Sequence, residues 1–123
     1  AEKAQQIVQS VIDSGESFKV IYAENDDMAK GAVAALDKAN ISHGVGKDVI
    51  VMGYDCNKWA LEELLAGNWN YDGQCNPFQA SYIDDIIKKL EAGETISEKT
   101  IIMDEKGFDA TTITQEDVDT YGI

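Results

Sequence analysis

The segment from Phe18 to Ala32 constrains the fold more than any other part of the chain, because its character changes twice. It begins with β-branched and aromatic residues, passes through a polar run, and ends with apolar residues at helical spacing. The polar run, Glu24 to Asp27, suits a helix N-terminus, since Asn and Asp oxygens accept hydrogen bonds from the free N–H groups of a first turn. Open α/β sheets bind ligands where a strand ends in such a loop. We therefore expect the functional site at the carboxyl end of this strand.

Helical and strand-like segments alternate along the whole chain. Helices are predicted at residues 4–12, from an Asn25 cap to 39, from an Asn57 cap to 67, and from an Asn76 cap with Pro77 at the first helical position to 93. Strands are predicted at residues 18–23, 48–55, 68–73, 99–103 and 108–113, with a helical turn in 114–123. The run at 48–55 is almost continuously apolar, which is typical of a strand buried on both faces. Repeated β-α-β units of this length predict an α/β fold, a parallel sheet with flanking helices.

The size and charge of the chain exclude several classes of protein. Its 123 residues suffice for one domain with a sizeable core. Its formal net charge is −13 and it contains no arginine, so no nucleic-acid partner is expected, since phosphate binding requires cationic side chains. Its apolar runs are far shorter than a membrane span. Residues 1–4 show neither a signal-peptide pattern nor an initiating Met, so we expect a processed chain or a piece of a longer one.

Three predicted strands end in polar residues, namely Asn25, Asp55 and Gln74. Because the carboxyl ends of parallel strands lie at one edge, we expect these side chains to gather there. A carboxylate accepts from hydroxyls, and amides both donate and accept, so the set can orient a polyhydroxylated ligand. Each residue also has a local interpretation: Asn25 caps a helix, Asp55 caps the turn after its strand, and Gln74 is exposed. No nucleophile or histidine accompanies them, so we expect no enzyme, and the sequence indicates no cofactor or metal.

At these positions the chain resembles the type I periplasmic sugar-binding proteins, the ribose- and galactose-binding group that serves ABC transporters. Residues 25–32 resemble the signature Asn-Asp-x-Met-Ala-x-Gly-Ala, and residues 51–55 resemble the strand end Val-x-Gly-Phe-Asp. Gln74 stands three residues before Pro77, where the family places an amide, and Gln-Cys-Asn-Pro resembles members that bind galactose as a furanose. Residues 113–119 resemble a mature C-terminus of the family. The resemblance implies a Rossmann-like, flavodoxin-like lobe.

This resemblance also implies a function and a set of site residues. Asn25, Asp55 and Gln74 would bind the hydroxyls of a monosaccharide, a pentose or a hexose, with Asp55 as the dominant acceptor. The family stacks sugars on aromatic rings, but for Trp59 and Phe78 of this chain we expect core packing. The partner would be the membrane permease of an ABC transporter, and the location periplasmic or extracellular, with a lipoprotein among the alternatives. Hinge closure around the sugar would precede docking on the permease.

The chain is short for this family, and the resemblance divides it into three parts. Residues 1–76 would belong to the carboxyl-terminal sugar-binding lobe, and residues 77–105 would be a helix and strand that pack on an absent amino-terminal lobe. Residues 106–123 would be a return segment and tail. The apolar stripe of Tyr82 to Leu90 and the edge of the Val20–Tyr22 strand would then be bare. Bare edges recruit partners, so we expect self-association, strand exchange or companion pieces.

The two cysteines, Cys56 and Cys75, fit no zinc or redox spacing and leave two interpretations open. One is a pair of free, partly buried thiols. The other follows from the resemblance, which places the strands before them side by side, so that a disulfide could brace the site in an oxidising compartment.

Two alternative functions remain at the sequence level. The effector domain of lactose-repressor-type regulators has the same fold and a similar Asn-Asp-x-Met-Ala motif, but it usually has a proline-rich stretch after the Asp55 position, which this chain lacks. A phosphoacceptor receiver domain would use Asp26, Asp27 and Asp55 to bind Mg²⁺. A strand-helix unit is missing between those acids, and no Lys precedes Pro77, which disfavours the receiver.

Overall fold

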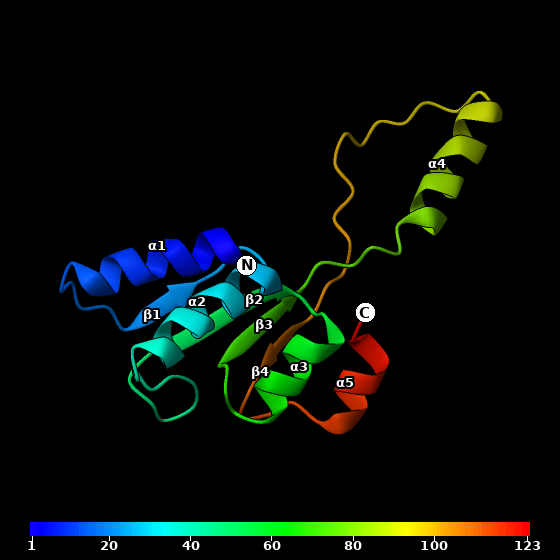
Figure 1. Ribbon diagram of the computed structural model, residues 1–123. Helices are drawn as coiled ribbons and strands as arrows, with labels where there is room; N and C mark the ends of the chain where they lie inside the picture. The colour runs from blue at the N-terminus through cyan, green and yellow to red at the C-terminus, as the bar shows by residue number, and fades with distance from the viewer. The chain divides into compact units, whose positions relative to one another are not determined.

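The computed structural model describes all 123 residues, and helices alternate with strands along most of the chain (Figure 1). The elements are α1 (Glu2–Asp13), β1 (Val20–Tyr22), α2 (Asp26–Lys38), β2 (Ile50–Asp55), α3 (Lys58–Leu65), β3 (Tyr71–Gln74), α4 (Ala80–Glu91), β4 (Gly107–Asp109) and α5 (Gln115–Tyr121). The chain forms two compact units, residues 1–75 with 106–123, and residues 76–105. No helix combines the length and the apolar character needed to cross a membrane.

The first unit contains a four-stranded sheet in the order β1-β2-β3-β4. The first three strands are parallel, as the alternation predicted, and the α/β class is confirmed. β4 runs antiparallel to β3, with Phe108 opposite Asp72. The sheet is therefore mixed, and the return segment supplies its last strand. β1 lies at one edge of the sheet, where a bare strand was expected.

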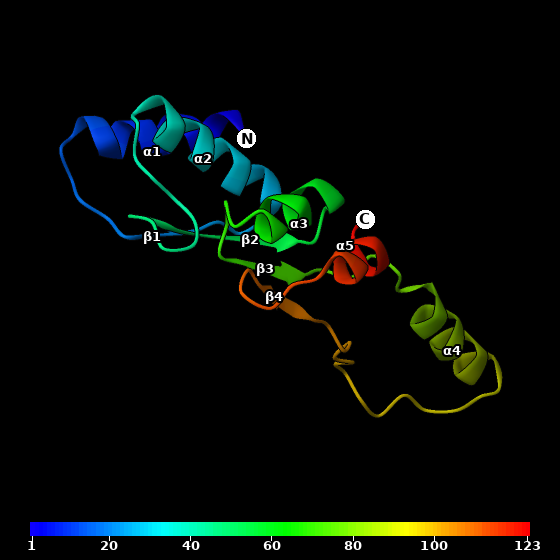
Figure 2. The ribbon, with the colours of Figure 1, turned by 90° about the horizontal axis from the view of Figure 1, so that it is seen from below.

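Helices α1, α2 and α3 all lie on one face of this sheet, and the opposite face carries no helix of the unit (Figure 2). Exposure along β2 alternates accordingly: Val51 and Gly53 are buried beneath the helices, whereas Ile50 is 43% exposed. The prediction that this strand is buried on both faces is therefore wrong. Its apolar run is continuous because both faces carry apolar side chains, but only one face is covered within this chain.

The hydrophobic core lies between the sheet and the helices. Leu36 of α2, Val51 of β2, and Leu61 and Leu64 of α3 are completely buried there, and Trp69 is 2% exposed. Burial of side chains of this size contributes about 1.5–3 kcal/mol each. Packing against the helices on this covered face therefore holds the strands, and with them the strand ends, in place.

The predicted strand at residues 99–103 is absent, although its residues include good β-formers. Ile101 and Ile102 are 45% and 88% exposed, and the sheet consists of β1 to β4 alone. A strand requires a neighbour for its N–H and C=O groups, and this segment has none in the chain. Of the predicted strand at 108–113, only Phe108 and Asp109 lie in a strand, β4, and Gly107 begins that strand instead of forming a turn.

Two predicted helix ends differ from the structure. α4 begins at Ala80 rather than at Pro77, because the Oδ1 atom of Asn76 accepts a hydrogen bond from the N–H of Phe78 at 2.8 Å and holds the chain in a turn. The end of α4 is as predicted, since Gly93 has φ of 77°. The tail forms all of α5, more than the predicted turn, with Thr114 and Asp117 in a reciprocal capping box.

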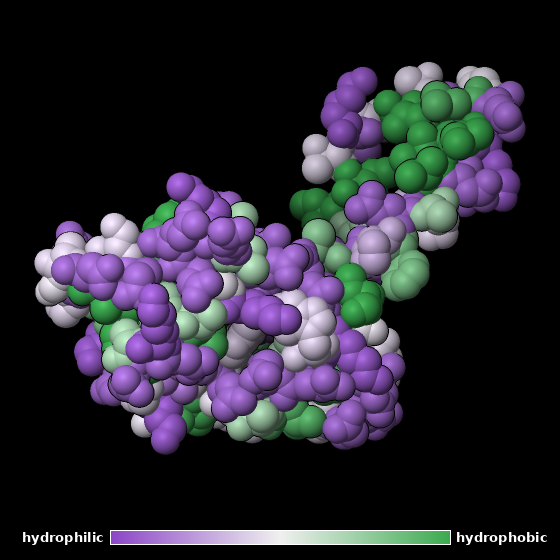
Figure 3. All heavy atoms as spheres, in the orientation of Figure 1, coloured by the Kyte–Doolittle hydropathy of each residue, from purple (hydrophilic) through white to green (hydrophobic).

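The second unit, residues 76–105, exposes an apolar surface. Tyr82, Ile83, Ile87 and Leu90 of α4 are 40–55% exposed, which confirms that the stripe is bare in this chain. Figure 3 shows hydrophobic residues gathered on the visible surface of this helix. An apolar stripe of this kind on a helix normally faces a core or a partner.

Candidate binding edge of the sheet

The three predicted site residues lie at, or just after, the carboxyl ends of β1, β2 and β3. We call this side of the sheet the carboxyl edge (Figure 1). Asp55 and Gln74 are the last residues of their strands and occupy paired register positions. Asn25 is the N-cap of α2, just after β1. The parallel pairing thus brings residues that are far apart in the sequence to the same edge of the sheet.

Asn25 caps α2, as its local interpretation predicted. Its Oδ1 atom accepts a hydrogen bond from the N–H of Met28 at 2.8 Å. Its Nδ2 amide makes no hydrogen bond within the chain, so two donor hydrogens stay available. The cap fixes the side chain and leaves its donor group for a ligand.

Asp55 ends β2 in an unusual backbone conformation. Its φ is 124°, and φ of the following Cys56 is 59°, in a region that favours glycine. Such strain persists only where surrounding structure enforces it, and it is concentrated at functional sites. The Asp55 carboxylate is half-buried and makes no hydrogen bond within the chain. Partial burial, followed by the charge of Asp27, raises the pKa of this carboxyl above its ordinary value.

Gln74 is held by the return segment. Its N–H donates to the carbonyl of Lys106 at 2.7 Å, and its Oε1 atom accepts from the N–H of Lys106 at 3.2 Å. The Nε2 amide makes no hydrogen bond within the chain. The carboxyl edge thus offers one carboxylate acceptor, from Asp55, between two amide donors, from Asn25 and Gln74, which is a set suited to hydroxyl groups.

Two buried acids lie beneath the carboxyl edge; from the sequence, we considered Asp26 only as a metal ligand of a receiver domain and did not consider Asp72. Asp26 and Asp72 both have no exposed surface. Burial raises the pKa of Asp26, and burial together with the charge of Asp26 raises the pKa of Asp72 to about 8. In the sequence, the one indication of this buried pair was a charged residue, Asp72, inside a short predicted strand.

Asn57 connects one of these acids to the turn after Asp55. Both its backbone N–H and its Nδ2 amide donate to Oδ2 of Asp26, at 2.8 and 3.1 Å. Asn57 is the N-cap of α3, as predicted, but its side chain bonds to Asp26 instead of to the helix. Asp26 therefore points inward, which argues against its use as a metal ligand in a receiver-like cluster with Asp27 and Asp55.

The two cysteines are not bonded in this structure. Cys56 is completely buried and Cys75 is exposed. Burial raises the pKa of the Cys56 thiol well above its ordinary value, so this side chain is an unreactive core residue.

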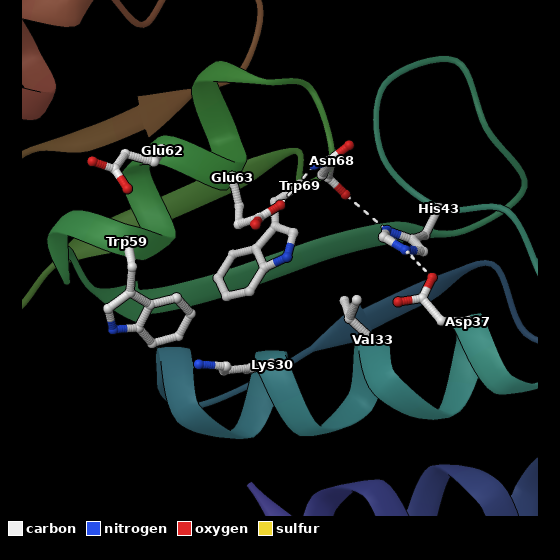
Figure 4. Close-up of a pocket in the computed structure, with 9 residues that line it drawn as sticks. All are labelled: Lys30, Val33, Asp37, His43, Trp59, Glu62, Glu63, Asn68 and Trp69. Carbon is white, nitrogen blue, oxygen red and sulfur yellow. Dashed lines mark hydrogen bonds and ion pairs between the residues drawn. The ribbon is translucent and has the colours of Figure 1, made fainter.

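A groove of about 390 Å³ lies between α2 and α3, and none of the three site residues lines it (Figure 4). His43 connects its two sides: Nδ1 lies 2.8 Å from the carbonyl oxygen of Asn68, and Nε2 lies 3.1 Å from Oδ1 of Asp37. The polar groups of this histidine are thereby used within the chain. Its contacts join the end of α2 to the loop before β3, and we assign them a structural role.

Trp59 and Phe78, the two aromatic residues considered for sugar stacking, differ in their surroundings. Trp59 packs against the core, with its ring centroid 5.9 Å from that of Trp69 at an interplanar angle of 88°, and Nζ of Lys30 lies 4.6 Å from the Trp59 centroid. Core packing of Trp59 is confirmed. Phe78 is 72% exposed, so the same expectation was wrong for this residue. It follows the Asn76 turn and has no core to enter in its own unit.

Comparison with known proteins identifies a family. Residues 1–94 match the family described as Periplasmic binding protein domain. The fructose import binding protein FruE of Bifidobacterium longum (strain NCC 2705) is 32% identical over 111 residues, which are 89% of this chain and 32% of the relative. The galactofuranose-binding protein YtfQ of Escherichia coli (strain K12) is 27% identical over 100 residues, which are 79% of this chain and 31% of the relative.

Structural comparison agrees with this match. The crystal structure of a galactofuranose binding protein superposes with a TM-score of 0.83 at 24% identity, over 98% of this chain and 40% of that one, which shows a shared fold. The chain spans about a third of the length of the curated relatives it matches. The family match covers most of the chain and includes β1, β2 and β3 with their carboxyl edge. This chain is a member of the periplasmic binding protein domain family.

Proposed function

We propose that this chain is the carbohydrate-binding part of an extracytoplasmic solute-binding protein that delivers a monosaccharide to an ABC transporter. The observation that carries the proposal is the pairing of Asp55 with Gln74 at the carboxyl edge, beside the Asn25 cap. All three side chains retain hydrogen-bonding groups that the chain itself does not use. The names of FruE and YtfQ, which refer to fructose and galactofuranose, support a sugar ligand.

In this proposal Asp55 accepts hydrogen bonds from two sugar hydroxyls, and the amides of Asn25 and Gln74 donate to hydroxyl or ring oxygens. Hydrogen bonds to a charged group contribute about 1.5–3 kcal/mol each, so Asp55 dominates the affinity. The strained backbone at Asp55 and the cap at Asn25 fix these groups before the sugar arrives. Preorganisation of this kind lowers the entropic cost of binding.

Among pentoses and hexoses, we propose a hexose in furanose form as the first ligand to test. The galactofuranose-binding relative supports this choice, as does the resemblance of Gln-Cys-Asn-Pro at residues 74–77 to furanose-binding members.

We propose further that this chain functions as part of a larger two-lobed protein. Its share of the relatives' length supports this, as does the exposed stripe of α4, which would pack against the second lobe. Residues 1–76 would supply the sugar site, residues 77–105 the contact with the other lobe, and residues 106–123 the closing strand and tail. The assembled protein would bind a membrane permease in the periplasm or outside the cell, free or as a lipoprotein. Without a second lobe, we expect the chain to self-associate.

A matched pair of sugars tests the ligand. The amide chemical shifts of the chain are followed during titration with methyl β-galactofuranoside and, separately, with methyl β-galactopyranoside, then with fructose, ribose and glucose. We expect the furanoside to shift the amides of Asn25, Asp55 and Gln74, and Asp55→Asn to remove the effect. Shifts scattered away from the carboxyl edge, equal shifts in Asp55→Asn, or no shift with any sugar would contradict the proposal.

A further inference from the structure

Asp26 and Asp72 are two fully buried carboxyl groups next to Gly53, close to the carboxyl edge. Gly53 occupies the register position beside Asp72, and a Cβ built on Gly53 would lie 2.6 Å from Oδ1 of Asp26. The absence of a side chain at Gly53 thus makes room for the Asp26 carboxyl between β2 and α2. A buried charge is costly unless it is compensated, so the pair requires a physical explanation.

Each carboxyl of the pair has one oxygen with a hydrogen-bond partner and one without. Oδ2 of Asp26 accepts two bonds from Asn57, and Oδ1 of Asp72 lies 3.9 Å from the Sγ donor of Cys56. The other two oxygens, Oδ1 of Asp26 and Oδ2 of Asp72, are buried and have no partner. Ionised carboxylates only accept hydrogen bonds, but a protonated carboxyl donates one. A single proton held between the two groups would satisfy both unpartnered oxygens.

We propose that Asp26 and Asp72 share one proton and act as positioning residues that hold the three strand ends of the sugar site together. This inference rests on the proposed function, because it assigns supporting residues to the same carboxyl edge.

The connections run from each site residue to the pair. Asp26 is the residue after Asn25, and Asp72 lies two residues before Gln74 in β3. Asn57, which donates twice to Asp26, follows the strained turn that presents Asp55. A bond between the two carboxyls therefore closes the link from β1 through the turn after β2 to β3.

The surroundings favour retention of this proton. The titratable groups that act on the pair are Asp55 and Tyr54 of β2 and the Cys56 thiol of the turn, and each is neutral or negative. Trp69 and Phe108 are buried core residues near the pair and carry no charge. Two unprotonated carboxylates would repel each other in this environment, since like charges sharing a site raise one another's pKa.

The pair makes stability depend on pH with a definite sign. The pKa of Asp72 is about 8 in the folded chain and near 3.8 when unfolded, so the folded state binds the extra proton between these values. Stability is therefore highest at the acid end of this window and falls as pH rises towards 8. Asn at position 72 is neutral at every pH and can donate to Asp26, so Asp72→Asn removes this dependence.

Three sugar-free measurements on the 123-residue chain test the pair. At pH 7 we expect an infrared carboxylic-acid band in the wild type that is lost in Asp26→Asn and in Asp72→Asn but kept in Asp85→Asn, an exposed acid of α4. The thermal unfolding midpoint of the wild type should fall from pH 5 to pH 8, and that of Asp72→Asn should fall by much less. The amides of Asn25, Asp55 and Gln74 should titrate together in the wild type, with one midpoint near pH 8.

Several results would overturn the inference. One is a wild-type infrared spectrum without the carboxylic-acid band, or with a band that Mg²⁺ removes. Another is a thermal unfolding midpoint that depends on pH in Asp72→Asn as strongly as in the wild type. A third is a different titration midpoint for each of the three amides. The infrared and titration results on the wild type keep the test decisive if a variant fails to fold. Because none of these readouts contains a sugar, failure of the proton pair is distinguishable from failure of the sugar titration.

Discussion

Asp55 and Gln74 form the last register pair of β2 and β3, so a carboxylate and an amide stand side by side at the carboxyl edge. Neighbouring parallel strands lie about 4.8 Å apart, so the two side chains leave the backbone close to each other. The pair can therefore engage neighbouring hydroxyls of one ring. The strand register, rather than any loop, sets this geometry.

We predict that Asp55→Asn weakens sugar binding about tenfold to a hundredfold, because one hydrogen-bond acceptor and its charge are lost. Asn tolerates positive φ, so the fold should be retained. Calorimetric or NMR titration measures the change in affinity. Glu24→Gln removes an exposed charge from the loop after β1, at the same edge of the sheet, and serves as the control, with affinity expected to stay within about twofold. If both variants lost the same affinity, the loss would come from the change in net charge and not from the hydrogen bonds of Asp55.

Asp55→Gly should separate backbone strain from ligand binding. Glycine adopts φ of 124° without strain, so we expect the free energy of unfolding to rise by about 1 kcal/mol while sugar binding is lost. Urea denaturation measures the stability. Asn25→Gly is the matched control, because its φ of −157° is ordinary extended backbone and its cap is lost, so its stability should fall. A fall in both variants would show that Asp55 is unstrained.

The pH dependence of sugar binding should follow the Asp55 carboxyl. Burial and the charge of Asp27 raise its pKa, so the free chain loses the binding-competent carboxylate as pH falls, beginning above the ordinary Asp range. Asp27→Asn removes a repelling charge, lowers the pKa of Asp55, and should shift the acid limb of binding to lower pH. Affinities measured between pH 7 and pH 4 test this. An acid limb that does not move in Asp27→Asn would contradict the assignment.

The cap of α5 should stabilise the tail. Thr114→Ala removes the hydrogen bond from the N–H of Asp117 and should lower the free energy of unfolding by about 1 kcal/mol. The Thr114 bonds also hold the pKa of Asp117 below its ordinary value. Urea denaturation compares this variant with Thr100→Ala, an exposed threonine outside any helix or strand. Equal stability of the two variants would show that the capping box contributes nothing.

The exposed stripe of α4 should drive self-association of the isolated chain. Ile83→Glu with Ile87→Glu places charge on this surface and should shift the chain towards monomer in sedimentation or light scattering. Asp85→Asn on the same helix is the control and should leave association unchanged. A wild-type chain that is monomeric at all concentrations would contradict this prediction.

The sequence predicted the carboxyl edge well, because its evidence is local. The alternation of segments gave three parallel strands, and the polar residue after each strand gave Asn25, Asp55 and Gln74. What it missed depends on tertiary pairing. Ile101 and Ile102 have β-forming side chains, but nothing local reveals that no strand lies beside them. Asp72 is a charged residue within a predicted strand, and only the covered face of β3 in the structure shows that it is buried.

The late return of the chain to β3 has a consequence for folding. Gln74 pairs with Lys106, which lies 32 residues further along, so its side chain is fixed only after a long loop has closed. Val20 and Ile50 pair over a similar distance, but α2 packs on the sheet within that span, whereas residues 76–105 form a separate unit. Non-local pairs of this kind delay folding. During synthesis, β1 and β2 can therefore assemble before β3 gains its second neighbour. A chain cut before Gly107 would keep Asn25 and Asp55 but leave Gln74 at an open strand edge.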